Sequence, residues 1–186
     1  MKVRTERIDN NEIYVIDHTV EPEDIEKFYA LVKSLSYSRN EKDDEKDKFP
    51  IFSVDFVPEK VEGSTVIGKM ARQLLSEFYP DQDFFLSRSY INMSHYGDME
   101  YPHRDCPEQA NDITILYYVN NHWDYTWGGE TVFYEEKDPK ILVLPAPGRF
   151  VIFPGRVEHL GSIPTRDCNQ SRFSFALKYK PGQFSI

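Results

Sequence analysis

The second half of the chain is built from short runs of aromatic and β-branched residues that are cut by glycine and proline. These runs cover residues 84–96, 101–105, 112–119, 130–134, 141–144, 150–154, 158–163 and 171–180. Short strands that follow one another at this spacing are typical of an all-β sandwich or barrel. The pattern therefore predicts a mainly β protein whose core is a jelly roll or a barrel.

The residues before this core predict two helices that pack on its outside. From about Pro22 to Leu35, apolar residues recur at the three- and four-residue spacing of one helix face, and Pro22 stands in the first turn, where proline is tolerated. The same spacing extends from about Glu62 to Tyr79, and Pro80 ends it.

No linker and no internal repeat divides the chain, so we expect a single domain over residues 1–186. Its jelly-roll core is predicted at about 84–180, and the part before it, about 1–83, supplies the helices and a short strand at 12–17. Between the helices, the run of mixed charge at 40–48 has no apolar anchor and predicts a solvated loop. The alternative is a mobile flap over a site, for which the run is long enough.

The composition argues against a membrane protein and against a nucleic-acid-binding protein. No apolar run approaches the ~18 residues that a membrane-spanning helix needs. The net charge is −9, and the arginines and lysines form no basic stripe that would gather phosphates. The N-terminus lacks the features of a secretory or transit peptide, and two cysteines are too few for a disulfide framework. We therefore expect a cytoplasmic protein with no membrane and no nucleic-acid partner.

Two candidate metal ligands stand two residues apart in the expected strand 101–105. His103 and Asp105 point to the same face of a strand, because side chains alternate between its two faces. His159, near the start of a later expected strand, is the third candidate. Two histidines and one carboxylate form the facial triad of non-heme Fe(II) oxygenases, which leaves the opposite face of the metal open. These residues therefore predict an Fe(II) site.

An arginine near the end of the chain predicts an anion-binding site. Arg172 opens an alternating strand whose other residues are core types. A guanidinium at the mouth of a barrel needs a planar anionic partner, because an unpaired buried charge is costly and a carboxylate accepts two hydrogen bonds from it. The dicarboxylate 2-oxoglutarate supplies such a partner. Arg166 is the alternative residue for this role.

Over roughly residues 84–180, the chain resembles the 2-oxoglutarate/Fe(II)-dependent dioxygenases, and within them the prolyl 4-hydroxylase-like group. An ordered set of short motifs carries the resemblance. The motifs are, in order, Tyr96-Gly97, His103-Arg104-Asp105, Ile113 to Asn120, Trp123-Asp124, Gly128-Gly129-Glu130, Pro147 to Phe153, His159 and Arg172.

The resemblance implies a double-stranded β-helix in which the three predicted ligands bind Fe(II) and form the catalytic centre. It implies 2-oxoglutarate and O2 as cosubstrates and ascorbate as the reductant. It also implies that Arg172 pairs with the distal carboxylate of 2-oxoglutarate, helped by the hydroxyl group of Tyr118. Thr114 and Tyr96 are expected to line the same pocket.

The activity implied is hydroxylation of a C–H bond, and the resemblance favours a prolyl or other protein or peptide side chain as the substrate. A biosynthetic oxygenase of a free amino acid or other small metabolite is the alternative, because the fold hosts many substrates. A peptide requires an open groove, whereas a metabolite pocket is closed and supplied with extra charged residues. A non-catalytic, cupin-type binding module is a more remote alternative, since neither cysteine is placed to complete a structural zinc site.

Overall fold

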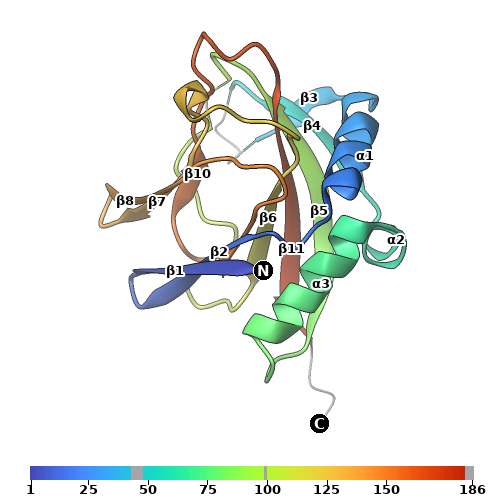
Figure 1. The fold of residues 1–186 in the computed structure, drawn as a ribbon. Helices are drawn as coiled ribbons and strands as arrows, with labels where there is room; N and C mark the ends of the chain where they lie inside the picture. The colour runs from blue at the N-terminus through green and yellow to red at the C-terminus, as the bar shows by residue number, and fades with distance from the viewer. Residues whose placement is uncertain (43–47, 99, 183–186) are drawn as a thin grey trace.

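The computed structural model describes residues 1–42, 48–98 and 100–182, and this part of the chain forms two antiparallel sheets with helices on one side (Figure 1). Its elements are β1 (Lys2–Ile8), β2 (Asn11–Asp17), α1 (Pro22–Lys33), β3 (Ser38–Glu41), β4 (Ile51–Phe56), α2 (Pro58–Ser64), α3 (Val66–Phe78), β5 (Phe84–Ser94), β6 (Ile113–Tyr118), the 3-10 turn η1 (Tyr125–Trp127), β7 (Thr131–Glu135), β8 (Asp138–Val143), β9 (Phe150–Pro154), β10 (His159–Gly161) and β11 (Arg172–Pro181). The predicted jelly-roll architecture is confirmed.

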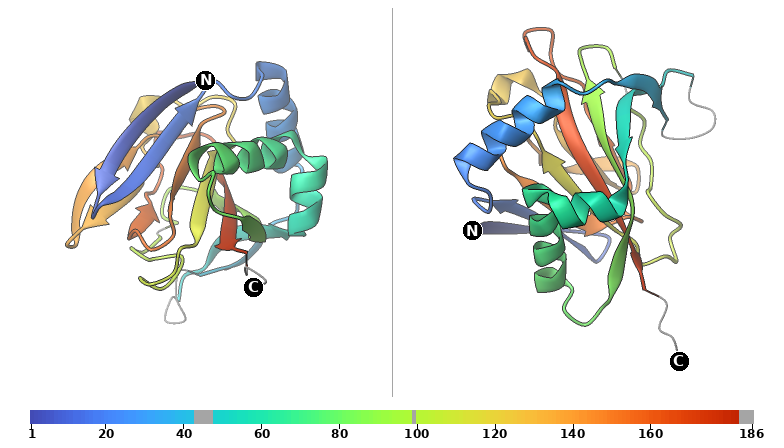
Figure 2. Two further views of the ribbon diagram at one scale, coloured as in Figure 1. Left: turned by 90° about the horizontal axis from the view of Figure 1, so that it is seen from below. Right: turned by 90° about the vertical axis from the view of Figure 1, so that its right-hand side faces the viewer.

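The two sheets differ in size and in what covers them. The large sheet has the strand order β1-β2-β9-β6-β11-β5-β4-β3, and the small sheet has the order β10-β7-β8. The helices lie on the outer side of the large sheet, as Figures 1 and 2 show, and the small sheet lies on its other side. The middle strands of the large sheet are therefore covered on both faces.

The central strands alternate between two hydrophobic cores. On β6, Ile113, Ile115 and Tyr117 pack into the core beneath the helices, whereas Leu116 and Tyr118 pack toward the small sheet. Side chains of a strand point alternately to its two faces, so every second residue of β6 packs into the same core. A polar residue on the inner side of these strands therefore lies between the two sheets.

The helices begin and end where the sequence allows. Pro22 occupies the first turn of α1, where its missing N–H leaves no intrahelical bond unmade, and Tyr29 and Val32 are buried against the sheet. None of the helices in the described ranges is long and apolar enough to cross a membrane.

The helix predicted from about Glu62 to Tyr79 is confirmed as α3 over Val66–Phe78, but its predicted start is wrong, because Glu62 belongs to α2, which meets α3 at Thr65. The backbone of Thr65 is extended, its hydroxyl accepts a hydrogen bond from the N–H of Gly68 at 2.9 Å, and it donates one to the carbonyl of Val61 at 2.8 Å. A threonine in this position caps a new helix. The cap takes the place of backbone hydrogen bonds that a continuous helix would form at this point. The helix axis therefore changes direction at Thr65, although the apolar spacing of the sequence continues through it.

The strand predicted at 101–105 is also absent as a regular strand. The segment joins the small sheet through a single bridge between His103 and His159. Conversely, β1, β3 and β4 were not predicted from the sequence. Asn40 and Glu41 belong to β3, so the predicted loop at 40–48 begins later than expected. The centre of the predicted flap, 43–47, lies outside the described residues.

The contact between α2 and α3 yields a test of this fold. A Cβ atom added at Gly68 would lie 2.3 Å from the backbone oxygen of Val61, so the two helices would have to move apart. We expect Gly68→Ala to lower the free energy of unfolding by about 1–3 kcal/mol, the usual cost of overpacking. Gly63→Ala is the matched control, because nothing lies within 4 Å of its added methyl group, and it should be neutral or slightly stabilising. Urea denaturation measures both, and equal stabilities would contradict the packing.

Candidate metal centre and its cavity

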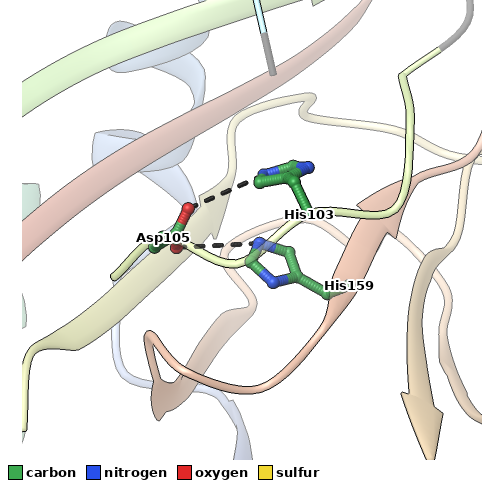
Figure 3. A group of neighbouring side chains, drawn as sticks. All are labelled: His103, Asp105 and His159. Carbon is green, nitrogen blue, oxygen red and sulfur yellow. Dashed lines mark ion pairs between the residues drawn. The ribbon is translucent and has the colours of Figure 1, made fainter. Parts of the chain in front are cut away.

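The three predicted metal ligands meet between the two sheets (Figure 3). His103 and Asp105 lie in the segment between β5 and β6, and His159 is the first residue of β10. Reciprocal backbone hydrogen bonds of 2.9 Å join the N–H and carbonyl groups of His103 and His159, and the N–H of Asp105 donates to the carbonyl of Gly155 at 2.8 Å. As a result, one potential ligand atom from each side chain lies within 4.8 Å of the others.

Backbone carbonyl groups set the orientation of both imidazole rings. The Nδ1 of His103 lies 2.8 Å from the carbonyl oxygen of Tyr101, and the Nδ1 of His159 lies 2.9 Å from that of Val157. A carbonyl oxygen only accepts, so each Nδ1 carries a proton and donates it, which leaves Nε2 as the nitrogen that faces Asp105. Both Nε2 atoms lie 3.6 Å from a carboxylate oxygen of Asp105. This is the usual arrangement of metal-binding histidines.

The electrostatics keep these ligands in their metal-binding protonation states. Burial lowers the pKa of His159 to about 4, so the ring is neutral at neutral pH. Burial alone would raise the pKa of Asp105, but the Lys178 ammonium and the two imidazoles hold it well below its usual range. The site therefore offers the neutral imidazole of His159 and the ionised carboxylate of Asp105.

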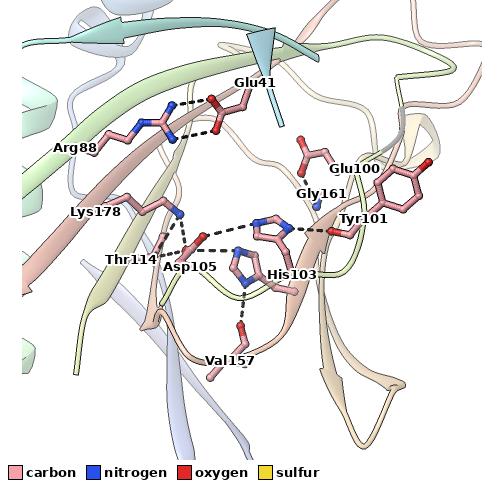
Figure 4. A network of polar contacts seen from close by, with 11 residues as sticks. Glu41, Arg88, Glu100, Tyr101, His103, Asp105, Thr114, Val157, Gly161 and Lys178 are labelled. Atoms are coloured by element: carbon pink, nitrogen blue, oxygen red, sulfur yellow. Dashed lines mark hydrogen bonds and ion pairs between the residues drawn. The ribbon is translucent and has the colours of Figure 1, made fainter. Parts of the chain in front are cut away.

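Thr114 and Lys178 hold Asp105 in place (Figure 4). The Thr114 hydroxyl and the Lys178 ammonium both donate to Oδ2 of Asp105, and they lie 3.5 Å from each other. Thr114 lines the cavity, and its hydroxyl group contacts the predicted metal ligand Asp105. Lys178 was not singled out from the sequence.

The signal for Lys178 is the alternation of β11. Arg172, Ser174, Ala176 and Lys178 all line one cavity, whereas the residues between them pack beneath the helices. Counting in steps of two from the predicted anion-binding arginine therefore leads to this lysine.

The cavity has a volume of about 400 Å³ and extends from the three ligands to Arg172. Arg172 is only 2% exposed. Its Nε donates to the carbonyl of Gly129 at 2.7 Å, and its Nη1 donates to the hydroxyl of Ser174 at 3.3 Å. In the described part of the chain, no carboxylate forms an ion pair with it. A buried guanidinium without a carboxylate partner is the feature expected of an anion site.

Tyr118 and Tyr96 do not take the places predicted for them. The Tyr118 ring lies 5.5 Å from the Arg172 guanidinium, but its hydroxyl group is engaged by Thr131 at 2.7 Å and by the carbonyl of Val143 at 2.9 Å. It therefore supports the arginine from behind the cavity wall. Tyr96 is 57% exposed outside the cavity, because it follows the end of β5.

The alternative anion-binding residue also lies away from the cavity. Arg166 is exposed, and its guanidinium lies 5.6 Å from the centre of the Tyr96 ring. It is absent from the lining of the cavity that holds the triad. The structure thus places Arg172, and not Arg166, together with the three ligands.

A family model described as the 2OG-Fe(II) oxygenase superfamily matches residues 91–179, the segment that supplies the three ligands and Arg172. Over this segment the chain is similar to the 2OG-Fe(II) oxygenase superfamily. It is a 2-oxoglutarate/Fe(II)-dependent dioxygenase, and the cofactors of this superfamily are Fe(II), 2-oxoglutarate and O2, with ascorbate as a typical addition. No curated protein sequence matches the chain.

Solved structures share the fold of this oxygenase. It is similar to a prolyl hydroxylase from Trichoplax adhaerens in complex with a peptide fragment of the hypoxia inducible factor oxygen degradation domain (TM-score 0.67, 14% identity, 90% of this chain and 83% of the other). It is also similar to a 2OG-Fe(II) oxygenase family oxidoreductase from Burkholderia pseudomallei (TM-score 0.69, 15% identity, 90% and 84%). A viral collagen prolyl hydroxylase from Paramecium Bursaria Chlorella virus-1 is a third (TM-score 0.63, 18% identity, 95% and 94%). At these identities the likeness concerns the fold.

The donor set of the oxygenase predicts its metal binding. We expect one Mn(II), an inert substitute for Fe(II), to bind per chain in calorimetry. His103→Ala, Asp105→Ala and His159→Ala should each weaken binding by at least about a hundredfold, and Thr114→Val by about tenfold, because outer partners of a ligand contribute less than the ligand itself. His122→Ala is the control, since this imidazole is exposed outside the cavity. A ligand variant with the parental affinity would exclude that residue from the site.

Proposed function

We propose that the oxygenase hydroxylates a C–H bond of a substrate held in this cavity, with 2-oxoglutarate anchored by Arg172. The observation that carries the proposal is the placement of a buried arginine without a carboxylate partner in the same cavity as the three ligands. Fe(II) held by His103, Asp105 and His159 would supply the oxidising chemistry, in which one oxygen atom of O2 would enter succinate and the other would enter the product. The conversion of 2-oxoglutarate into succinate would release carbon dioxide.

The protein binds and orients the cosubstrate through a small set of contacts around Arg172. The carbonyl of Gly129 and the hydroxyl of Ser174 fix the guanidinium, and the Tyr118 ring lies beside it. Gly129 has a φ of +74°, and a Cβ atom there would lie 3.0 Å from the Arg172 side chain. Glycine at this turn therefore allows the arginine to approach the backbone closely.

Two classes of substrate remain as proposals. The likeness in fold to prolyl hydroxylases, one of them in complex with a peptide, supports a prolyl or other peptide side chain. The charged residues Glu41, Arg88 and Lys178 in the cavity lining support a free amino acid or other small metabolite.

Arg172→Ala tests the placement of the cosubstrate. We expect this variant to raise the KM for 2-oxoglutarate at least about thirtyfold, because losing one partner of a buried charge pair costs about 2 kcal/mol or more. Succinate formation measures the KM, and calorimetry with Mn(II) should give an affinity for the metal close to that of the parent.

Arg166→Ala is the control for this experiment, because Arg166 lies outside the cavity. It should leave the KM for 2-oxoglutarate unchanged. A strong effect of Arg166→Ala together with a mild effect of Arg172→Ala would place the anion site elsewhere.

A further inference from the structure

A lysine side chain contacts the carboxylate of the predicted metal centre. The Lys178 ammonium donates to Oδ2 of Asp105, and the same oxygen accepts a hydrogen bond from the Thr114 hydroxyl (Figure 4). Lys178 lies on β11 and Thr114 on β6, so the fold and not sequence proximity brings both donors to Asp105. Among the residues that the structure describes, Lys178 is the one lysine or arginine that pairs with a predicted metal ligand.

These two hydrogen bonds give the two oxygens of Asp105 different roles. A carboxylate oxygen accepts through about two lone pairs, and Thr114 and Lys178 together occupy those of Oδ2. The other oxygen, Oδ1, lies 3.6 Å from Nε2 of His103. This leaves Oδ1 for a bond to the metal, so that Lys178 acts on the metal through the carboxylate and does not bind it.

The charge of Lys178 is poorly screened at this point. Its side chain is 18% exposed and that of Asp105 is 8% exposed, so little water lies between the ammonium and the metal site. The nearby Arg88 is already paired, because its terminal nitrogens contact the two oxygens of Glu41 at 3.1 and 2.6 Å. The Lys178 ammonium therefore places a positive charge beside the metal site at short range.

A fixed positive charge beside a metal ligand opposes oxidation of the metal. Fe(III) carries one more positive charge than Fe(II), so a neighbouring ammonium destabilises Fe(III) more. The hydrogen bonds to Oδ2 also draw electron density from the Asp105 carboxylate and make Oδ1 a weaker donor. A weaker donor costs the more highly charged ion more. Both effects of Lys178 therefore favour the reduced state.

We propose that Lys178 is a positioning residue that holds the iron of this site in its Fe(II) state. The inference rests on the proposed function, because it concerns the iron that the same three ligands would bind. Without a substrate, loss of one electron to O2 would convert Fe(II) to Fe(III) and O2 to superoxide, and ascorbate would return one electron to the iron. Lys178 makes this loss less favourable and so lowers the demand for ascorbate.

A purely structural role of Lys178 predicts a different result. The lysine also neutralises the buried Asp105 carboxylate when no metal is bound, and removing one partner of a buried pair is destabilising. A structural change of this kind alters the affinity for Fe(II) and for Fe(III) in the same direction. The loss of a charge alters the ratio of the two affinities, and the Fe(III)/Fe(II) potential reports that ratio.

The first experiment measures this potential in the iron-loaded protein by anaerobic redox titration, with Fe(III) followed by electron paramagnetic resonance. Lys178→Gln keeps a hydrogen-bond donor for Asp105 but removes the charge, so we expect the potential to fall by at least about 59 mV, which is a tenfold change of the ratio. Lys178→Arg keeps the charge and should stay within about threefold of the parental ratio. Lys140→Gln is the matched control, because Lys140 pairs with Asp138 at 2.8 Å outside the cavity.

The second experiment follows the loss of Fe(II) in air, without substrate, 2-oxoglutarate or ascorbate, by means of a chelator specific for Fe(II). Lys178→Gln should lose Fe(II) at least threefold faster than the parent protein, and added ascorbate should remove the difference. Thr114→Val takes a neutral donor from the same oxygen of Asp105, so it should change the Fe(III)/Fe(II) ratio less than Lys178→Gln does.

Two results would overturn this inference and leave the proposed function intact. One is a parental potential in iron-loaded Lys178→Gln. The other is an equal fall in Lys178→Gln and Lys178→Arg, because the charge is then not the cause. A parent protein that binds neither Fe(II) nor Mn(II) in calorimetry instead overturns the proposed function, and the role of Lys178 with it.

Discussion

The reciprocal backbone pairing of His103 with His159 joins the segment before β6 to the small sheet. Two hydrogen bonds of 2.9 Å place the two imidazole rings with their centres 4.6 Å apart, and Asp105 follows within the same segment. Because each Nδ1 donates to a local carbonyl group, the metal-binding nitrogens are turned inward before any metal arrives. The arrangement of the whole centre depends on this pairing between residues distant in sequence.

Because side chains alternate between the two faces of the large sheet, polar side chains on its inner face can line a cavity beside the candidate metal centre. The outer residues of β11, such as Phe173 and Phe175, are buried beneath the helices, and this leaves the inner residues free to be polar. Arg172 and Lys178 stand on this inner side six residues apart, Arg172 at the proposed cosubstrate end and Lys178 beside Asp105. One strand therefore serves the hydrophobic core, the proposed anion site and the predicted metal ligand Asp105, each through a different position of the same repeat.

Sequence reasoning found the ligands and Arg172 because both patterns are local: a two-residue spacing and a charge at the start of an apolar strand. It missed what depends on contacts between distant segments. The hydroxyl of Thr114 turns to Asp105, and Glu41 reaches the cavity from β3, whose pairing with β4 no local pattern announces. Tyr96 was misplaced because β5 ends before it. The helix break at Thr65 was hidden because the apolar spacing continues through it.

The measurement that tests this account most directly is a crystal structure of the protein with Mn(II) and 2-oxoglutarate, grown without oxygen. We expect one metal ion about 2.1 Å from Nε2 of His103, Nε2 of His159 and an oxygen of Asp105, the usual distance for such donors. We also expect the distal carboxylate of 2-oxoglutarate in a paired contact with the Arg172 guanidinium. A metal ion bound by other residues, or a distal carboxylate held by another cation, would contradict the account.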